Sequence, residues 1–455
     1  MASSGRRQDI RYGAIVSQKY FEGAMMLERK RFTGAIKRGD DAFALEFDVW
    51  SGEDGRLSIE AQPLDKQAIF RLQGAMGEPG SYSESLILEG ASADGTTFFS
   101  DTVELQGARV GTRKNSVMVE ARKAKVTLDC TETAEAPLVR LWFRSFKAFR
   151  NPTVTMSLGK VCVGGEQKPS SEDEMSGHVV LQALERVNID DWLKQAGEFL
   201  TFMHLGLAFA HGGRLQTPRK DVIVGNRWEA TYYGGRGFRR SLAPIHYLNQ
   251  GPFIKALAKR FDYPKPFPDM LWTAVGWLHN DNSFDEGRFL MSMTALETVV
   301  EHVIPKTLTT VIPRADFKAV RSRLLAALAE CRLEKTPEEI FEGKLKSLNR
   351  RSLSQKIQTL RDHYGLSKDV FSDHAIIHVI KARNDIVHTG ELSTHRDLWT
   401  KEVFVRELIA LIVFQELGYE GPYESYVNGY RTVHPPSPQD QPASSGVEAS
   451  GAPVA

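Results

Sequence analysis

The sequence predicts a multidomain protein in which an antiparallel β-sandwich-like domain is followed by a mixed α/β region and a C-terminal all-α helical bundle. Three observations carry this prediction. Apolar and polar residues alternate in the first third of the chain, helical and strand-like patterns mix in the middle, and amphipathic helices fill the last third. The expected divisions are a β-rich domain over 1–163, a linker over 164–177, a mixed region over 178–271, a helical domain over 272–431 and a disordered tail over 432–455.

Length and composition limit the possible classes. A chain of 455 residues, 42% of them hydrophobic, can bury the cores of roughly two or three domains. Its net charge of +1 gives no overall basic field, so any contact with nucleic acid must be local. The three cysteines are widely separated and favour neither a disulfide framework nor a thiolate metal site. Without a secretory signal or a long apolar run, we expect a cytoplasmic protein with no membrane contact.

The β-rich domain is predicted from short alternating segments. Residues 43–49, 56–60, 116–120 and 139–143 place apolar side chains at every second position, and clusters of Gly, Asp and Ser separate them. This pattern is typical of antiparallel strands with one face buried, so we expect two sheets packed as a sandwich.

The middle of the chain mixes both kinds of element. A charged stretch of small residues, 164–177, is the expected linker, and the residues from 188 to about 211 read as a helix. Strands are expected over 221–224 and 227–233. The following loop carries Arg236, Arg239 and Arg240 among glycines and aromatics. Such a loop could guide RNA by stacking and phosphate contact, although we favour an ordinary glycine turn with solvated arginines.

Residues 373–389 form the segment with the clearest functional signal. Its apolar residues Ile376, Val379, Ile380, Ile386 and Val387 fall on one helical stripe, which indicates a helix packed on a partner. Thr389 and Gly390 then supply the stop, with the glycine in the position of a left-handed cap.

Within this helix, Arg383 lies inside the apolar stripe and needs a partner or a cleft, because an isolated buried charge is very costly. Asn384 and His388 lie one turn apart on the flank of the stripe. Five positions separate Arg383 from His388, so on an ideal helix they point about 140° apart. Either the helix end distorts at His388, or two copies of the helix meet around a two-fold axis and share one site. We favour the second, which would bring both side chains together.

An arginine and a histidine without a metal cluster are suited to cleaving a phosphodiester by charge stabilisation and acid–base chemistry. Arg383 would stabilise charge on the phosphate oxygens, and His388 would act as general acid or base. Asn384 would hold His388 or a phosphate oxygen. Glu297 borders a second apolar stripe and is the expected partner of Arg383. The alternative is a structural Arg383–Glu297 pair, with His388 only capping carbonyl groups.

His374 and His378 have the i, i+4 spacing of a zinc-binding helix. No cysteine lies nearby, and the residues between them are Ala375, Ile376 and Ile377, without the glutamate of a hydrolytic zinc helix. We therefore expect a solvated polar face and no bound metal or other cofactor.

The run Arg383-Asn-Asp-Ile-Val-His388 resembles the R-x4-6-H motif of HEPN domains, and the segment 272–430 resembles the Apea-like HEPN group. A helix over 291–300 precedes the motif helix, and a closing apolar helix over 403–417 follows it. The resemblance implies a dimeric all-α bundle that acts as a metal-independent ribonuclease, in which the RNA 2′-hydroxyl attacks and a 2′,3′-cyclic phosphate remains. Similar modules accompany β-rich N-terminal domains in bacterial phage-defence proteins.

The sequence thus predicts an endoribonuclease that is a homodimer through its helical domain, acts on RNA and responds to a phage-derived trigger. A non-catalytic HEPN-type interaction or ligand-binding module is the alternative, and a metal-dependent nuclease using His374 and His378 comes third. RNA cleavage in the presence of a chelator, measured with and without Arg383 and His388, separates these possibilities.

Overall fold

The protein is described by a computed structural model in which the chain forms two compact units. The first unit draws on residues 1–240 and 246–264, and the second on residues 241–245 and 265–455. Each unit has its own core, and each is described separately below. The residues whose structure is described are 27–65, 67–73, 85–109, 116–131, 133–169, 171, 173–185, 187–235, 242–280, 282–390 and 398–436.

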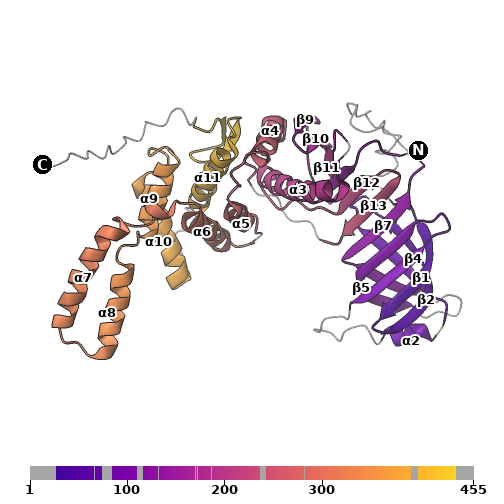
Figure 1. The fold of residues 1–455 in the computed structure, drawn as a ribbon, viewed down its shortest axis with the longest axis horizontal. Coiled ribbons are helices and arrows are strands. Elements are labelled where there is room, and N and C mark those ends of the chain that lie inside the picture. Colours follow the sequence, from indigo (N-terminus) through magenta and orange to yellow (C-terminus); the bar gives the residue numbers. More distant parts are fainter. Residues whose placement is uncertain are drawn as a thin grey trace. The chain divides into compact units, whose positions relative to one another are not determined.

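An antiparallel β-sheet organises the first unit (Figure 1). Among the described residues it contains thirteen strands in the order β4-β1-β2-β3-β6-β5-β7-β13-β12-β8-β11-β10-β9. In chain order these strands are β1 (Lys30–Arg38), β2 (Asp41–Ser51), β3 (Leu57–Pro63), β4 (Leu86–Ala91), β5 (Thr97–Arg109), β6 (Ser116–Ala121), β7 (Lys123–Asp129), β8 (Leu138–Arg144), β9 (Thr153–Met156), β10 (Gly159–Gly165), β11 (Met175–Gln182), β12 (Arg219–Val224) and β13 (Arg227–Tyr233).

The first six strands close into a barrel, so the predicted sandwich is wrong. β4 pairs with β1 at one side and with β5 at the other, which joins the two ends of the order β4-β1-β2-β3-β6-β5. β5 is long enough to pair with β4, β6 and β7, and it leads from the barrel into the rest of the sheet. Alternating apolar residues show that one face of each strand is buried, but they do not reveal whether a sheet closes on itself.

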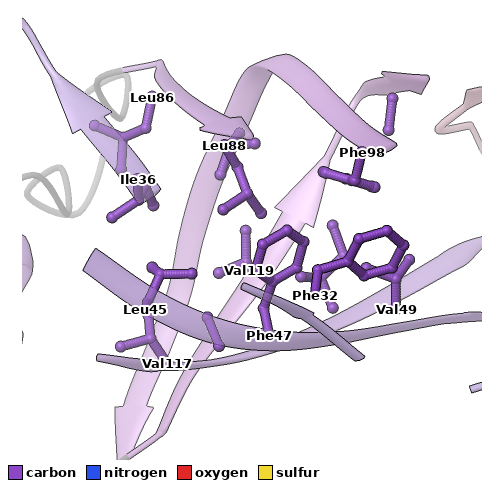
Figure 2. Packing of buried hydrophobic residues seen from close by; sticks show 14 of the residues in the cluster. Phe32, Ile36, Leu45, Phe47, Val49, Leu86, Leu88, Phe98, Val117 and Val119 are labelled. Carbon is purple, nitrogen blue, oxygen red and sulfur yellow. The ribbon is translucent and has the colours of Figure 1, made fainter. Parts of the chain in front are cut away.

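Two glycines permit the close approach of the strands that closes the barrel. Gly34 of β1 pairs with Gly90 of β4, and a Cβ atom on Gly34 would lie only 1.9 Å from the carbonyl oxygen of Glu89. The barrel interior is filled by aliphatic side chains around a group of phenylalanines (Figure 2), with the Phe32 and Phe47 rings 5.2 Å apart and the Phe47 and Phe98 rings 5.4 Å apart. Glycine at closing positions and large residues inside are the local features that favour a barrel.

The remaining strands extend the same sheet beyond the barrel. β12 and β13, which match the strands expected over 221–224 and 227–233, lie between β7 and β8. The expected separate α/β middle region is therefore wrong, because its strands belong to the N-terminal sheet. Residues 164–177, expected as a linker, instead include the ends of β10 and β11, which pair as a hairpin.

Helices of the first unit pack against this extension. α3 (Ile189–His211) begins at Asn188, whose side chain accepts a hydrogen bond from the backbone N–H of Asp191, and it ends at Gly212 with φ 77°. It contacts β8, β11 and α4 (Gln250–Phe261). The helix expected from 188 to about 211 is thus confirmed. The shorter helices of this unit are α2 (Ala68–Gln73) and η1 (Tyr247–Asn249).

The second unit is mainly helical, as the C-terminal patterns predicted. α11 is buried over most of its length, and α6 contacts α5, α9, α10 and α11, so these two helices form the centre of the unit. A two-stranded sheet accompanies the helices. The elements are α5 (Asp269–Leu278), α6 (Asp285–His302), η2 (Lys306–Leu308), α7 (Arg314–Glu330), α8 (Lys335–Ser347), α9 (Leu353–His363), α10 (Asp373–Thr389), α11 (Leu398–Leu417), β14 (Tyr423–Ser425) and β15 (Arg431–Val433).

Two sequence expectations concern the end of the chain and the membrane. Thr432 and Val433, which the sequence assigns to a disordered tail, form part of β15 and pair with Glu424 and Tyr423. The rest of the expected tail, from residue 437 onward, lies outside the described residues. Across the described helices, none combines the length and the apolar character needed to cross a membrane.

Candidate functional site

The expected motif helix is present as α10, with the bounds that the sequence pattern predicted. Ser372 begins it, and its side-chain oxygen accepts a hydrogen bond from the backbone N–H of Ala375 at 3.2 Å. Gly390 ends it at φ 76°, a left-handed conformation that glycine adopts without the penalty of a Cβ atom. The predicted glycine cap is therefore confirmed, and it fixes where the helix that carries Arg383 and His388 stops.

α10 buries a narrower face than its apolar residues suggest. Ile376, Val379 and Ile386 of the predicted stripe are buried, but 51% of Val387 is exposed, so the stripe prediction is wrong at Val387. The reason is that, among the described helices and strands, only α6 and α9 make substantial contact with α10. A second apolar face, which includes Ile377 with 52% exposure, remains open to solvent.

Arg383 forms the expected ion pair with Glu297 of α6. The guanidinium Nε lies 3.2 Å from Glu297 Oε1, and the two side chains are 31% and 33% exposed. Arg383 Nη1 also donates a hydrogen bond to Asn384 Oδ1 at 3.2 Å. The partner predicted for Arg383 is thus confirmed, whereas a catalytic role of either residue stays a prediction. Because both side chains are partly exposed, this pair stabilises the fold by roughly 1 kcal/mol or less.

An open groove with a volume of about 580 Å³ lies beside this ion pair. Its size falls in the range of small-molecule sites, so it can take a nucleotide unit. Three elements of the second unit form it, namely α6, the beginning of α9 and α10. The lining residues are Glu297, Glu301, Ser352, Leu353, Ser354, Ile377, Ile380, Arg383 and Asn384. The structure therefore brings together three of the four predicted catalytic residues, Arg383, Asn384 and Glu297.

The first turn of α9 contributes residues that the sequence reasoning missed. Ser352 caps the helix in a reciprocal arrangement: its Oγ accepts from the backbone N–H of Gln355, and the Gln355 side chain accepts from the backbone N–H of Ser352. The spacing Ser-x-x-Gln was a readable signal for this helix start. The N-terminal end of a helix favours negative charge, so α9 adds a weak anion preference to one side of the groove.

Glu301 is the other missed residue, and it lies one helical turn after Glu297 on the same face of α6. Its carboxylate forms an ion pair with the ammonium group of Lys356. The groove thus contains two carboxylates, each engaged by a cation, and its charge is close to balanced. An anion that enters must replace one of these pairs or bind beside it.

His388 lies at the end of α10, where its side chain is exposed. In the part of the chain that the structure describes, it has no hydrogen-bond or ion-pair partner. Arg383 and His388 lie on opposite edges of the exposed face that carries Ile377, Asn384 and Val387, about 140° apart around the helix. One copy of α10 therefore presents both groups beside the same exposed face but does not direct them to one point.

His374 and His378 lie on α10 with their rings 4.2 Å apart. Both side chains are exposed, as expected for a solvated face. Among the described residues, no group of three or more His, Cys, Asp and Glu side chains is placed so that it could hold a metal ion. The weakly predicted RNA-binding residues Arg236, Arg239 and Arg240 lie outside the described residues.

Comparison with known proteins gives no relatives: no family model, no curated protein and no solved structure matches this chain.

Proposed function

We propose that the second unit is a metal-independent endoribonuclease of the HEPN type, which acts as a homodimer through the exposed face of α10. The observation that carries the proposal is the position of Arg383. Its guanidinium lines an open groove of about 580 Å³ and is held there by a partly exposed ion pair that a phosphate can replace. A buried, fully enclosed arginine would instead be structural.

Arg383 and Asn384 of the groove, together with His388 of two copies, can perform the steps of RNA cleavage by internal transesterification. The ribose 2′-oxygen forms a bond to phosphorus while the bond to the 5′-oxygen of the next nucleotide breaks, leaving a 2′,3′-cyclic phosphate and a 5′-hydroxyl. One imidazole accepts the proton of the 2′-hydroxyl, and a protonated imidazole donates to the departing oxygen. Arg383 stabilises the charge that develops on the non-bridging oxygens, and Asn384 positions it through their hydrogen bond.

Two copies of α10 supply what one copy lacks. A two-fold axis through the exposed face would cover Ile377 and Val387, which are half-exposed in one chain. It would also place Arg383 of one copy near His388 of the other, since these residues lie on opposite edges of that face. The same contact then buries apolar surface and assembles the two imidazoles that the reaction uses.

Cleavage of a labelled RNA in the presence of EDTA tests this proposal. We expect Arg383→Ala and His388→Ala each to lower the cleavage rate by roughly 100-fold or more, because each removes a group that acts in the transition state. Lys381→Ala and His378→Ala, exposed residues of matching type on the same helix, should cleave at the wild-type rate. Equal rates for all five proteins, or loss of activity in EDTA alone, would contradict the proposal.

A second candidate is a non-catalytic interaction module that uses the same face of α10. The observation that favours it is the pairing of Arg383 with Glu297, which already neutralises the guanidinium within one chain. In that case the wild-type protein forms a dimer but leaves RNA intact, and Val387→Asp disrupts the dimer. Cleavage by the wild type that depends on Arg383 excludes this candidate.

A further inference from the structure

Helices α7 and α8 form an antiparallel hairpin in which no residue is buried (Figure 1). We call residues 314–348 the arm. Most helices in proteins are stabilised by packing an apolar face rather than by their own propensity. The two helices of the arm contact each other, yet this contact is too small to bury any of their side chains. The arm therefore has an apolar surface that is still open to a partner.

Several large apolar side chains of the arm are exposed. Val320 is 43% exposed, Ile340 54%, Phe341 47% and Leu348 56%. Val320, Ile340 and Phe341 lie near the middle of the arm and Leu348 at its base, and Leu333 at the tip is 38% exposed. A partner that covers all of them must therefore run along the arm. Another pair of helices laid against the arm would convert it into a four-helix bundle, in which such residues form the core.

Hydrogen bonds join the two ends of the arm to each other at its base. Asn349 is buried, and its side chain bonds the backbone N–H of Ile312 at 3.0 Å and the carbonyl oxygen of Ile312 at 2.9 Å. Arg351 Nε donates to the carbonyl oxygen of Thr310 at 3.0 Å. The two ends of the hairpin are thus joined at its base, and the arm presents its surface as one piece.

The balance of charge differs between the two halves of the arm. The basic half, at the base (residues 314–322 and 340–348), has five cations and two carboxylates (Asp316 and Glu342), and the acidic half, at the tip (residues 323–339), has four carboxylates and three cations (Arg323, Arg332 and Lys335). Each half holds like charges side by side, which is unfavourable within one copy. The cations of the basic half are Arg314, Lys318, Arg321, Lys344 and Lys346, and the carboxylates of the acidic half are Glu330, Glu334, Glu338 and Glu339.

These charges find little compensation inside the arm. Every residue of the arm is described, and no ion pair joins two of its side chains. Arg321 Nε is enclosed by the hairpin and has no hydrogen-bond acceptor among the described residues. A partner with the opposite order of charges would satisfy both halves at once.

We propose that the arms of two copies of this chain pack antiparallel around a two-fold axis, each basic half against the acidic half of the other. A two-fold axis brings the same surface of both copies together, so a surface with opposite charges at its two ends is complementary to itself. RNA fits this surface less well, because the acidic tip would repel phosphates and the exposed apolar side chains would stay uncovered. The inference does not depend on the proposed ribonuclease activity.

Charge reversal in the full-length chain tests the arrangement by sedimentation. Glu338→Lys with Glu339→Lys makes both halves net basic, and Lys344→Glu with Lys346→Glu makes both halves net acidic. The dissociation constant of the dimer should be roughly tenfold higher or more for each double variant alone, because like charges then meet. An equimolar mixture of the two should associate as the wild type does, since opposite charges face each other again in the mixed pair.

Two controls show whether the charge order of the arm is responsible. Lys255→Glu with Lys259→Glu, two exposed lysines one turn apart on α4, should leave the association unchanged. Cys331 lies at the tip of the arm, and in an antiparallel pair the two tips lie roughly 25 Å apart. Oxidation should therefore not form a disulfide between the two copies of Cys331. The proposal is overturned if both arm variants associate like the wild type. It is also overturned if the Lys→Glu arm variant loses only RNA binding, or if Cys331 links the two copies.

Discussion

The buried ion pairs of the first unit allow a quantitative prediction of stability. Asp221 of β12 is 0% exposed, and its carboxylate contacts two buried guanidiniums. Arg219 Nε lies 2.6 Å from Oδ1, and Arg140 Nε lies 2.8 Å from Oδ2, which also accepts a bond from Trp142 Nε1 at 2.7 Å. Burial alone would raise the pKa of Asp221, but Arg219 and Arg140 hold it below its ordinary value.

The substitution Asp221→Asn removes this negative charge and preserves the shape of the side chain. Arg140 and Arg219, which are 2% and 1% exposed, then keep their charges in the interior without the carboxylate between them. Removing one partner of a buried ion pair costs about 3–5 kcal/mol, and a whole domain is stable by only about 5–15 kcal/mol. We expect a loss within the first range, so most molecules remain folded in the absence of denaturant.

Urea unfolding followed by tryptophan fluorescence measures this loss, because Trp142 contacts the substituted carboxylate. The midpoint should fall while the slope stays constant, since the surface exposed on unfolding does not change. Asp129→Asn, an exposed aspartate on β7, which β13 separates from β12, is the matched control and should shift the free energy by less than about 0.5 kcal/mol. A loss below about 1 kcal/mol for Asp221→Asn would refute the argument from buried charge.

Three further predictions concern other parts of the molecule. Burial lowers the pKa of His178 to about 3. Between about pH 6.5 and 3 the unfolded chain therefore binds a proton that the folded chain does not. The free energy of unfolding should fall by about 1.4 kcal/mol per pH unit as the pH drops through this range. In urea titrations, His178→Gln should show a shallower dependence of this free energy on pH. Gly34→Ala should destabilise the barrel by about 1–3 kcal/mol or more, while Gly107→Ala, with open space around it, should not. Glu297→Gln should tighten RNA binding by no more than about fivefold, because an exposed ion pair contributes at most about 1 kcal/mol. A weaker affinity for RNA would contradict this.

The local elements of the fold were predictable, but their assembly was not. The strands expected over 221–224 and 227–233 and the helix over 373–389 are present, since each depends on a short pattern of apolar residues and caps. Closure of the barrel depends on pairings between β4 and both β1 and β5. The pairing of Gly34 with Gly90 joins residues far apart in the sequence, and no periodicity within one segment indicates it.

The candidate site shows the same division. The Arg383–Glu297 pair was predictable because Arg383 lies within the apolar stripe of one helix and Glu297 borders the apolar stripe of another. The exposure of Val387 was not, because it depends on how much of α10 its neighbours cover. Glu301 and Ser352 were missed, although both could be read from the sequence. Glu301 lies one helical turn after Glu297, and Ser352 begins a Ser-x-x-Gln capping pattern that ends at Gln355.

The balance of charge in the groove limits which anions it can hold. A phosphate that binds Arg383 by replacing Glu297 breaks an ion pair worth at most about 1 kcal/mol, and a hydrogen bond to a charged group returns about 1.5–3 kcal/mol. One such contact therefore leaves a net gain of roughly 0.5–2 kcal/mol, which corresponds to very weak binding. Useful affinity requires further contacts, and within one chain His388 lies too far around α10 to provide one at the same phosphate. If the groove does bind RNA, its affinity must therefore depend steeply on protein concentration, because a second copy has to supply the missing contact.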